Sequence, residues 1–192
     1  KRNYITLQSN IDDGLILYEY QKLFSRNNKT FLSKLKRIKV INNIEEKLLD
    51  PVLLTLKNKI FLFASSKKIP NITNCLGQIT FENGKVFLNK NNIFCESING
   101  RMAGKFIFKK NKIIANTQLF INSYGDGIQQ YEIKKGNKPQ KIKKIIFKQG
   151  SYYGPHTLNY SPKNVFILFD ICRKSYSLFN IYFKLRQFLK MR

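Results

Sequence analysis

Residues 101–133 read RMAGKFIFKKNKIIANTQLFINSYGDGIQQYEI. Their pattern predicts two short strands joined by a turn, then a polar loop and a third strand. Phe106 and Phe108 alternate with Lys105 and Lys109, which is typical of a strand with one buried and one exposed face. A unit of this size cannot bury its own apolar face. It therefore requires neighbours of similar build.

Predicted hairpins of the same build lie on both sides of this stretch. Upstream, VLLTL is followed by KIFLFA, and ITF by KVFL, each pair joined by a short polar turn. Downstream, TLNY and VFILF flank residues 161–164, and residues 4–7 and 15–21 predict a further hairpin. The three main units begin at Asp50, Arg101 and His156, roughly fifty residues apart, which is the spacing of β-propeller blades. The sequence therefore predicts three imperfect blades.

A family resemblance rests on short motifs in a fixed order. They are Asp50-Pro51, Arg101 with Ala103-Gly104, Gln118, Ser123-Tyr124-Gly125 and His156-Thr157. In this order they resemble the propeller domain at the N-terminus of glucosamine inositolphosphorylceramide transferases and in bacterial polysaccharide-biosynthesis proteins. That domain is similar to the five-bladed propeller of family 43 glycoside hydrolases. The resemblance covers about residues 15–170, although Leu119 replaces a common acidic or amide residue and the family's frequent Trp is absent.

The resemblance implies an all-β fold with part of a five-bladed β-propeller. Residues 1–172 would form about three blades, and the remaining blades would precede Lys1. Residues 173–192 differ, because their apolar side chains recur at helical spacing while Lys and Arg occupy other faces. We expect a basic amphipathic C-terminal helix there. It would pack on the propeller, continue into a partner domain or make peripheral contact with a membrane.

The charge balance is strongly positive. The chain has 35 Lys plus Arg against 11 Asp plus Glu, a net charge of +24, and only seven of the 35 are Arg. A surface that binds phosphates bidentately is expected to use more Arg. One interpretation is solvated Lys on exposed strand faces, favoured by AT-rich codons. The other is attraction to anionic glycans, nucleotide-sugars, lipid headgroups or nucleic acid.

Cysteine usage and missing motifs limit the chemistry. The three cysteines, Cys75, Cys95 and Cys172, do not have the spacing of a metal site, and their odd number argues against a complete set of disulfides. This favours a reducing compartment, and therefore a cytoplasmic location. The protein would be peripheral to the inner membrane if the C-terminal helix binds it. No Walker-type loop, GxGxxG, GxSxG or HExxH occurs, which argues against nucleotide hydrolysis, Rossmann cofactors, serine hydrolysis and zinc proteolysis. We expect no metal and no cofactor.

Three charged candidates are expected to converge. In a propeller the first strand of each blade lines the axis, which would bring Asp50, Arg101 and His156 to one funnel mouth. Together they suit a sugar or a sugar phosphate. Asp50 is the candidate catalytic carboxylate; alternatively it fixes the Asp-Pro turn. Arg101 would hold a phosphate or carboxylate or form an ion pair with Asp50, and His156 would contact the ligand or have a structural hydrogen bond.

Neutral candidates surround these charges. Gln118, Tyr124 and Asn159 offer donors and acceptors for sugar hydroxyls, and the Tyr124 ring could stack on a pyranose face or pack in the core. Glycoside hydrolysis would need a second carboxyl roughly 5–10 Å from Asp50. The candidates for that second carboxyl are Glu96, Asp126, Glu132 and Asp170.

The resemblance implies a carbohydrate-binding or carbohydrate-processing domain of bacterial surface polysaccharide biosynthesis, of capsule or lipopolysaccharide, associated with glycosyl or formyl transfer. Transferase activity in the plant relatives belongs to a separate domain, so whether this domain is an enzyme stays open. One alternative is a glycoside hydrolase of the family 43-like type, active or degenerate. Another is a basic protein that binds nucleic acid or an anionic membrane. Nucleic acid is disfavoured, because the aromatic residues fall at core-like spacing within predicted strands.

Overall fold

The computed structural model describes residues 3–6, 16–20, 36–41, 47–109, 111–121, 126–160 and 167–173. Every regular element in these ranges is a β-strand, arranged in several largely antiparallel sheets, and the all-β prediction is confirmed. Within these residues no helix is long and apolar enough to cross a membrane. The helix predicted for residues 173–192 falls, apart from its first residue, outside the described residues.

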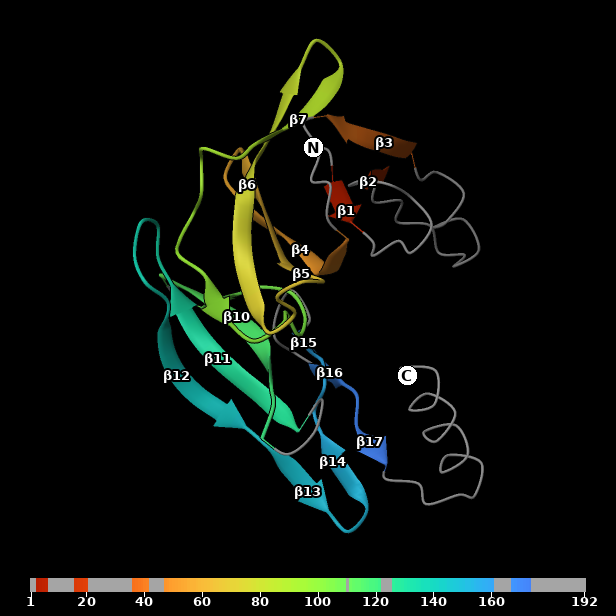
Figure 1. Cartoon of the computed structure of the whole chain (residues 1–192), viewed down its shortest axis with the longest axis vertical. Coiled ribbons are helices and arrows are strands. Elements are labelled where there is room, and N and C mark those ends of the chain that lie inside the picture. The colour runs from red at the N-terminus through yellow and green to blue at the C-terminus, as the bar shows by residue number, and fades with distance from the viewer. Residues whose placement is uncertain are drawn as a thin grey trace.

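The first sheet has eight strands and contains the first predicted unit. Its order is β1-β2-β3-β7-β6-β5-β4, with β8 paired to β6 (Figure 1). The strands are β1 (Asn3–Thr6), β2 (Ile16–Tyr20), β3 (Lys36–Ile41), β4 (Leu48–Leu56), β5 (Lys59–Ser66), β6 (Ile72–Glu82), β7 (Lys85–Asn89) and β8 (Ile98–Asn99). From β4 to β7, neighbours in the sheet are also neighbours in sequence, so both predicted hairpins are confirmed.

The turn between β6 and β7 shows why the local sequence predicts these hairpins. Asn83 and Gly84 have φ angles of 48° and 74°. A two-residue turn with two positive φ angles matches the twist of the flanking strands, and Asn-Gly is the pair that adopts it at least cost. The register Glu82↔Lys85 follows directly.

The N-terminal strands extend the first sheet. β1 and β2 form the predicted antiparallel hairpin, and β3 adds to β2. β3 then pairs with β7 in parallel, through Val40↔Val86 and Ile41↔Phe87. This parallel junction joins the hairpin to the edge of the sheet and has no signature in the local sequence.

The second sheet contains most of residues 101–133. Its order is β12-β11-β10-β9, formed by β9 (Ile107–Lys109), β10 (Lys112–Leu119), β11 (Gly127–Ile133) and β12 (Gln140–Ile145). All pairs are antiparallel, with one register shift opposite Gln130 and Tyr131. The two strands, turn and third strand predicted for this stretch are confirmed.

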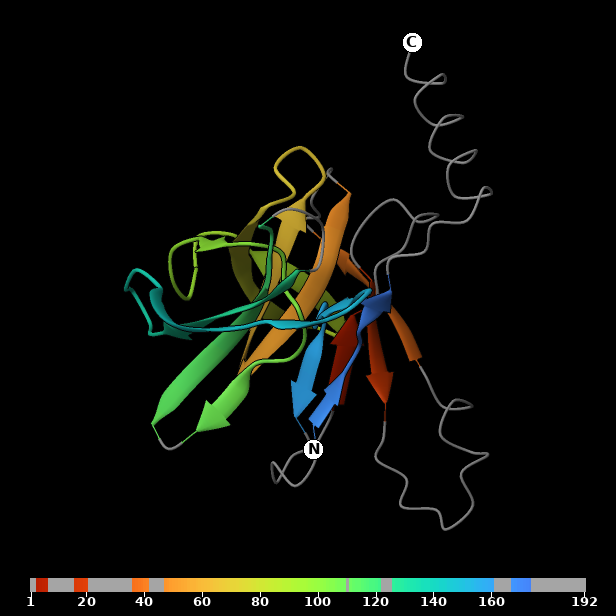
Figure 2. The same ribbon diagram turned by 90° about the horizontal axis from the view of Figure 1, so that it is seen from below.

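Two smaller sheets follow. β13 (Phe147–Gln149), β14 (Tyr152–Gly154) and β17 (Cys172–Arg173) form one, and β15 (Leu158–Tyr160) pairs with β16 (Ile167–Phe169) in the other. The predicted pairing of TLNY with VFILF is confirmed by the register Asn159↔Leu168. Strands β4 to β7 lie above β10 to β12 in Figure 1, and Figure 2 shows the two sheets from below, where their strands cross in projection.

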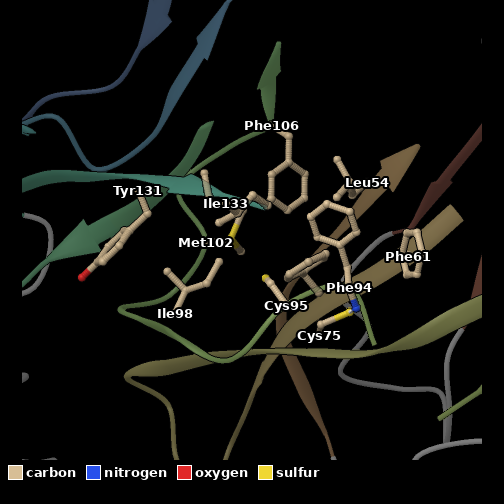
Figure 3. Packing of buried hydrophobic residues seen from close by; sticks show 12 residues of the cluster. Leu54, Phe61, Cys75, Phe94, Cys95, Ile98, Met102, Phe106, Tyr131 and Ile133 are labelled. Carbon is tan, nitrogen blue, oxygen red and sulfur yellow. Dashed lines mark hydrogen bonds between the residues drawn. The ribbon is translucent and has the colours of Figure 1, made fainter. Parts of the chain in front are cut away.

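The main core lies between these two sheets. Phe63 of β5 contacts Phe106 with ring centroids 4.9 Å apart, and Phe61 contacts Phe94 at 5.3 Å. In Figure 3, Ile133 of the second sheet and the nearby Met102 lie on one side of the cluster, and Leu54 of the first sheet lies on the other. On β5 the alternate side chains Ile60 and Leu62 enter a second cluster, so this strand is buried on both faces. The main cluster comprises Leu54, Phe61, Phe63, Cys75, Phe94, Cys95, Ile98, Met102, Phe106, Ala115, Tyr131 and Ile133.

Two cysteines belong to this core. Cys75 and Cys95 are buried free thiols, and the Cys75 Sγ accepts a hydrogen bond from the Phe94 N–H at 3.1 Å. Burial raises the pKa of Cys95 to about 12, and the neighbouring Cys75 and Glu96 act in the same direction. These thiols therefore behave as apolar packing groups.

Residues 100–105, here called the crossing segment, connect three sheets by backbone hydrogen bonds. The Gly100 N–H donates to the Asn71 carbonyl beside β6 at 2.7 Å, and the Ala103 N–H donates to the Asn116 carbonyl of β10 at 2.9 Å. The Ala103 carbonyl accepts from the Leu158 N–H of β15 at 2.8 Å. This short segment thus fixes the separation of the three sheets.

Replacing Gly104 should test that role. Gly104 has a φ of 129°, and a Cβ placed there would lie 2.3 Å from the Leu158 carbonyl oxygen. We expect Gly104→Ala to lower the free energy of unfolding by about 3 kcal/mol, from backbone strain and overpacking together. Gly136→Ala is the control, because its φ is 72° but no atom lies within 4 Å of the new Cβ. Urea denaturation should show that Gly136→Ala lowers the free energy of unfolding by about 1 kcal/mol. An equal loss of unfolding free energy in the two variants would contradict the packing role of Gly104.

A buried carboxylate gives the fold a pH dependence. Glu132 on β11 bonds the Lys112 ammonium at 2.7 Å and the Lys134 ammonium at 3.1 Å. The hydrogen bonds from Lys112 and then Lys134 lower the pKa of Glu132 below its usual 4.5, against the opposing effect of burial. The unfolded chain therefore takes up this proton at a higher pH than the folded chain does. Stability from Glu132 is present above its usual pKa and is lost as pH falls through the folded value.

We therefore expect Glu132→Gln to have a lower Tm than the wild-type chain at neutral pH. The gap should narrow as pH falls below about 4.5 and vanish below the folded pKa, where the wild-type carboxyl is also neutral. Thermal melts of both chains from neutral pH down to acidic pH measure this difference in Tm. Glu82→Gln, which removes the same charge at an exposed position of β6, controls for net charge. A Tm gap that stays constant with pH would contradict the assignment.

Candidate functional site

The candidate site is built on an ion pair between β4 and the crossing segment. The Arg101 Nε donates to the Asp50 Oδ2 at 2.7 Å, across 51 residues of sequence. The two side chains are 17% and 26% exposed, so the pair is partly shielded and still open to a ligand. This contact is one of the two roles that the sequence suggests for Arg101.

The backbone at Asp50 explains how its side chain is directed. Asp50 has a φ of 48°, and the pairing of β4 with β5 shifts register between Leu49 and Val52. A bulge of this kind bends the strand and re-aims a side chain. Asp tolerates a positive φ better than most residues, and Pro51 has no N–H to lose from the ladder. The Asp-Pro sequence therefore suits the bulge that places the carboxylate beside Arg101.

Gln118 of β10 lies directly opposite Arg101. The Gln118 N–H donates to the Arg101 carbonyl at 2.7 Å, and Met102 bridges to Thr117 in the antiparallel sense. Residues opposite one another in such a ladder have their side chains on the same face, about 5 Å apart at Cβ. Gln118 is only 3% exposed, and its Oε1 is buried with no donor among the described residues.

Asn159 reaches the other end of the crossing segment. Its Oδ1 accepts a hydrogen bond from the Lys105 N–H at 3.1 Å. On the adjacent residue of β15, the Leu158 carbonyl accepts from the buried Asn116 amide at 3.2 Å. Asn159 therefore has a structural contact that the sequence does not predict. Its partner, Lys105, follows Arg101 by four residues in the crossing segment.

His156 belongs to a second cluster, formed with Asp170. The His156 Nδ1 lies 3.2 Å from the Asp170 Oδ2, and the His156 N–H donates to the Asp170 Oδ1 at 3.1 Å. The N–H and hydroxyl of Thr157 also donate to this carboxylate. Burial would raise the pKa of Asp170, but the hydrogen bonds from Thr157 and His156 outweigh it, so the pKa is lowered. Asp170 thus holds the turn that precedes β15.

The structure brings some of the candidates together. Asp50, Arg101 and Gln118 form one cluster at the crossing segment, and Asn159 bonds the same segment. His156 contacts Asp170, a pairing that the sequence did not predict. The two residues are 14 apart, and no recognisable local motif joins them. Tyr124 lies outside the described residues.

Three of the four candidates for the second carboxyl are engaged in separate places. Asp126 accepts the Ile121 N–H at 3.1 Å, Glu132 bonds two lysines, and Asp170 bonds His156 and Thr157. None of these contacts involves Asp50. No group of three or more His, Cys, Asp or Glu side chains within the described ranges could hold a metal ion.

Comparisons with protein-family models, curated proteins and solved structures found no match for this chain. The chemistry of the site therefore has to follow from its own residues.

A double-mutant cycle should measure the Asp50–Arg101 pair. We expect Asp50→Asn and Arg101→Gln each to lower the free energy of unfolding, with a coupling of about 1 kcal/mol because the charges are partly shielded. Chemical denaturation of the two single variants and the double variant gives this value. Arg101→Gln combined with Glu82→Gln should be additive, since Glu82 lies on the exposed end of β6. Additivity in the Asp50 cycle would show that the pair contributes nothing.

Proposed function

We propose that this chain is a carbohydrate-binding domain of the β-propeller type that holds a sugar or sugar phosphate beside Asp50, Arg101 and Gln118. The observation that carries the proposal is the buried Gln118 Oε1, which accepts no hydrogen bond from the described residues. Leaving a buried acceptor without a donor costs about 1–3 kcal/mol. A sugar hydroxyl would remove that cost once the Gln118 side chain, which is 3% exposed, turns its carbonyl oxygen toward the ligand.

The neighbouring charges suit the same ligand. A guanidinium can donate to a sugar hydroxyl or to a phosphate oxygen, and a carboxylate accepts from hydroxyl groups. Gln118 lies opposite Arg101 in a short ladder, and Asp50 bonds the Arg101 side chain, so a sugar ring held at Arg101 would have all three residues around it. A binding site built from a few fixed polar groups is the arrangement that gives orientation and specificity.

The arrangement of the sheets supports a β-propeller as the particular all-β architecture of this chain. β4 to β7 and β9 to β12 are each four antiparallel strands in chain order, and their faces pack on one shared core. Neighbouring blades of a propeller have this relationship. The parallel attachment of β3 to β7 is a departure from the simple pattern, since it adds strands to an outer edge.

The motif resemblance extends the proposal to the biosynthesis of a bacterial surface polysaccharide, where such a domain would bind a sugar-containing substrate or product. The proposal assigns binding and no bond cleavage. A glycoside hydrolase would need a second carboxyl near Asp50, and the other carboxylates with described contacts have partners elsewhere.

Gln118→Met and Gln129→Met form a matched test. Gln118→Met removes the unpartnered carbonyl, so we expect unchanged or slightly higher stability and at least about tenfold weaker sugar binding. The Gln129 amide donates to the Gln130 and Lys143 carbonyls, so Gln129→Met should destabilise the fold without changing affinity. Saturation-transfer NMR against hexoses, sugar phosphates and nucleotide-sugars would identify a ligand, and titration calorimetry would give its affinity.

Two outcomes would overturn the proposal. The first is the absence of any bound sugar or sugar phosphate in that panel at millimolar concentration. The second is a ligand that binds Gln118→Met and the wild-type chain with equal affinity. Asp50→Asn gives a further check, since it should weaken binding of a neutral sugar by replacing one of the two acceptor oxygens with an NH₂ donor and removing the charge.

A further inference from the structure

Lysine is concentrated on one edge of the second sheet. Residues 134–148, here called the lysine-rich edge, contain seven lysines, and no Asp or Glu occurs between residues 133 and 169. Lys134 pairs with Glu132, whereas the other six have no acidic partner among the described residues. All seven are exposed. They are Lys134, Lys135, Lys138, Lys141, Lys143, Lys144 and Lys148.

Large apolar side chains are exposed among these lysines. Ile142 and Ile146 are 46% and 51% exposed, and Phe147 and Tyr152 are 37% and 44% exposed. Ile142 lies within β12 and Phe147 begins β13, so both lie between lysines along the chain. Exposed apolar side chains that gather in one place mark an interaction surface more often than isolated ones do.

The geometry makes this edge continuous. β12 is the last strand of its sheet, and β12 followed by the β13–β14 hairpin runs along one side of the molecule to the end opposite β7 (Figure 1). Lys143 and Lys144 pair with Gln130 and Gln129, so they leave opposite faces of the sheet. Their long stems allow both ammonium groups to reach around the edge.

The hairpin adds an aromatic tip. Phe147 pairs with Gly154 and Gln149 with Tyr152, so Phe147 and Tyr152 project from the same face of the hairpin. A hollow of about 110 Å³ lies beside them, and its lining includes the Lys148 ammonium side chain and one carboxylate, Asp126. The tip therefore combines aromatic rings, a lysine and room for a small polar group.

Three kinds of partner can be compared against these features. A further protein sheet would bury six ammonium groups that have no acidic partner among the described residues, at a large desolvation cost. A soluble polyanion would pair with the lysines but leave Ile142 and Ile146 in water. The interface of an anionic bilayer satisfies both groups, because phosphates attract the lysines while apolar and aromatic side chains enter the headgroup region.

We propose that the lysine-rich edge and the β13–β14 hairpin dock on an anionic lipid bilayer. Lysines 135–148 contact the headgroups, and Phe147 and Tyr152 enter the interface from the hairpin. The surface is separate from Asp50, Arg101 and Gln118, so this docking does not depend on the sugar site. It would hold that site near lipid-linked or membrane-associated ligands.

Vesicle binding of matched lysine variants tests the electrostatic part. The full chain should co-sediment with vesicles of two parts phosphatidylcholine to one part phosphatidylserine, and should not do so with phosphatidylcholine alone or at high salt. Lys141→Gln, Lys143→Gln and Lys144→Gln together should weaken partitioning on the order of a hundred-fold. The control replaces the exposed Lys59, Lys67 and Lys85 by Gln, with the same change in net charge. Equal losses in both triple variants would overturn the assignment.

A tryptophan probe tests the apolar part. The chain has no Trp, so Phe147→Trp gives a single tryptophan at the hairpin, and Phe81→Trp gives one on β6 at similar exposure. With anionic vesicles, the emission of Phe147→Trp should shift to the blue and be quenched by bromine-labelled lipid. Phe81→Trp should show neither effect.

Two results of these experiments would overturn the proposal. Vesicle binding that leaves the emission of the Phe147→Trp variant unchanged would place the contact elsewhere on the chain. Binding of heparin or single-stranded DNA without vesicle binding would assign the edge to a soluble polyanion.

Discussion

The close approach of the crossing segment to two strands is the constraint on which the described structure depends. Its backbone bonds the Asn71 carbonyl, β10 and β15, so its position determines where three sheets meet. A Cβ at Gly100 would lie 2.6 Å from the Gln118 carbonyl oxygen, and one at Gly104 would lie 2.3 Å from the Leu158 carbonyl oxygen. Only residues without a side chain fit at these two points. The sheets can therefore approach closely enough for Phe63 and Phe106 to pack in one core.

The same backbone positions the candidate site. Arg101 lies between the two glycines, and its carbonyl is held by the Gln118 N–H, so its side chain leaves the ladder in a fixed direction. Asp50 meets it from a bulge in β4, where Pro51 prevents regular pairing. Gln118 lies opposite Arg101 in this ladder and is buried, with no donor for its Oε1 in the described part of the chain. The backbone of this site therefore loses little conformational freedom when a ligand binds.

Local chemistry explains which features could be predicted from the sequence. Asn83-Gly84 requires a tight turn, and the alternation around Phe106 requires a half-buried strand, so the hairpins follow from neighbouring residues. The Asp50–Arg101 contact is one of the two roles that the sequence suggests for Arg101. In contrast, the parallel β3–β7 pair, the His156–Asp170 contact and the isolated Oε1 of Gln118 depend on residues that only the folded chain brings together. No local pattern encodes such contacts, since many alternative pairings are equally compatible with it.

The distribution of charge distinguishes two explanations of the net charge of +24. A bias toward AT-rich codons raises the number of lysines throughout a chain, but it does not remove acidic residues from one region. The 11 acidic residues lie on either side of residues 133–169 and none lies within, although seven lysines of this region are exposed on one edge. Lysine at a sheet edge also prevents unwanted strand pairing. That function gives no reason for exposed Ile142, Ile146 and Phe147 among the lysines. An edge that combines charge of one sign with apolar side chains is therefore better explained by a surface that offers both phosphate and hydrocarbon.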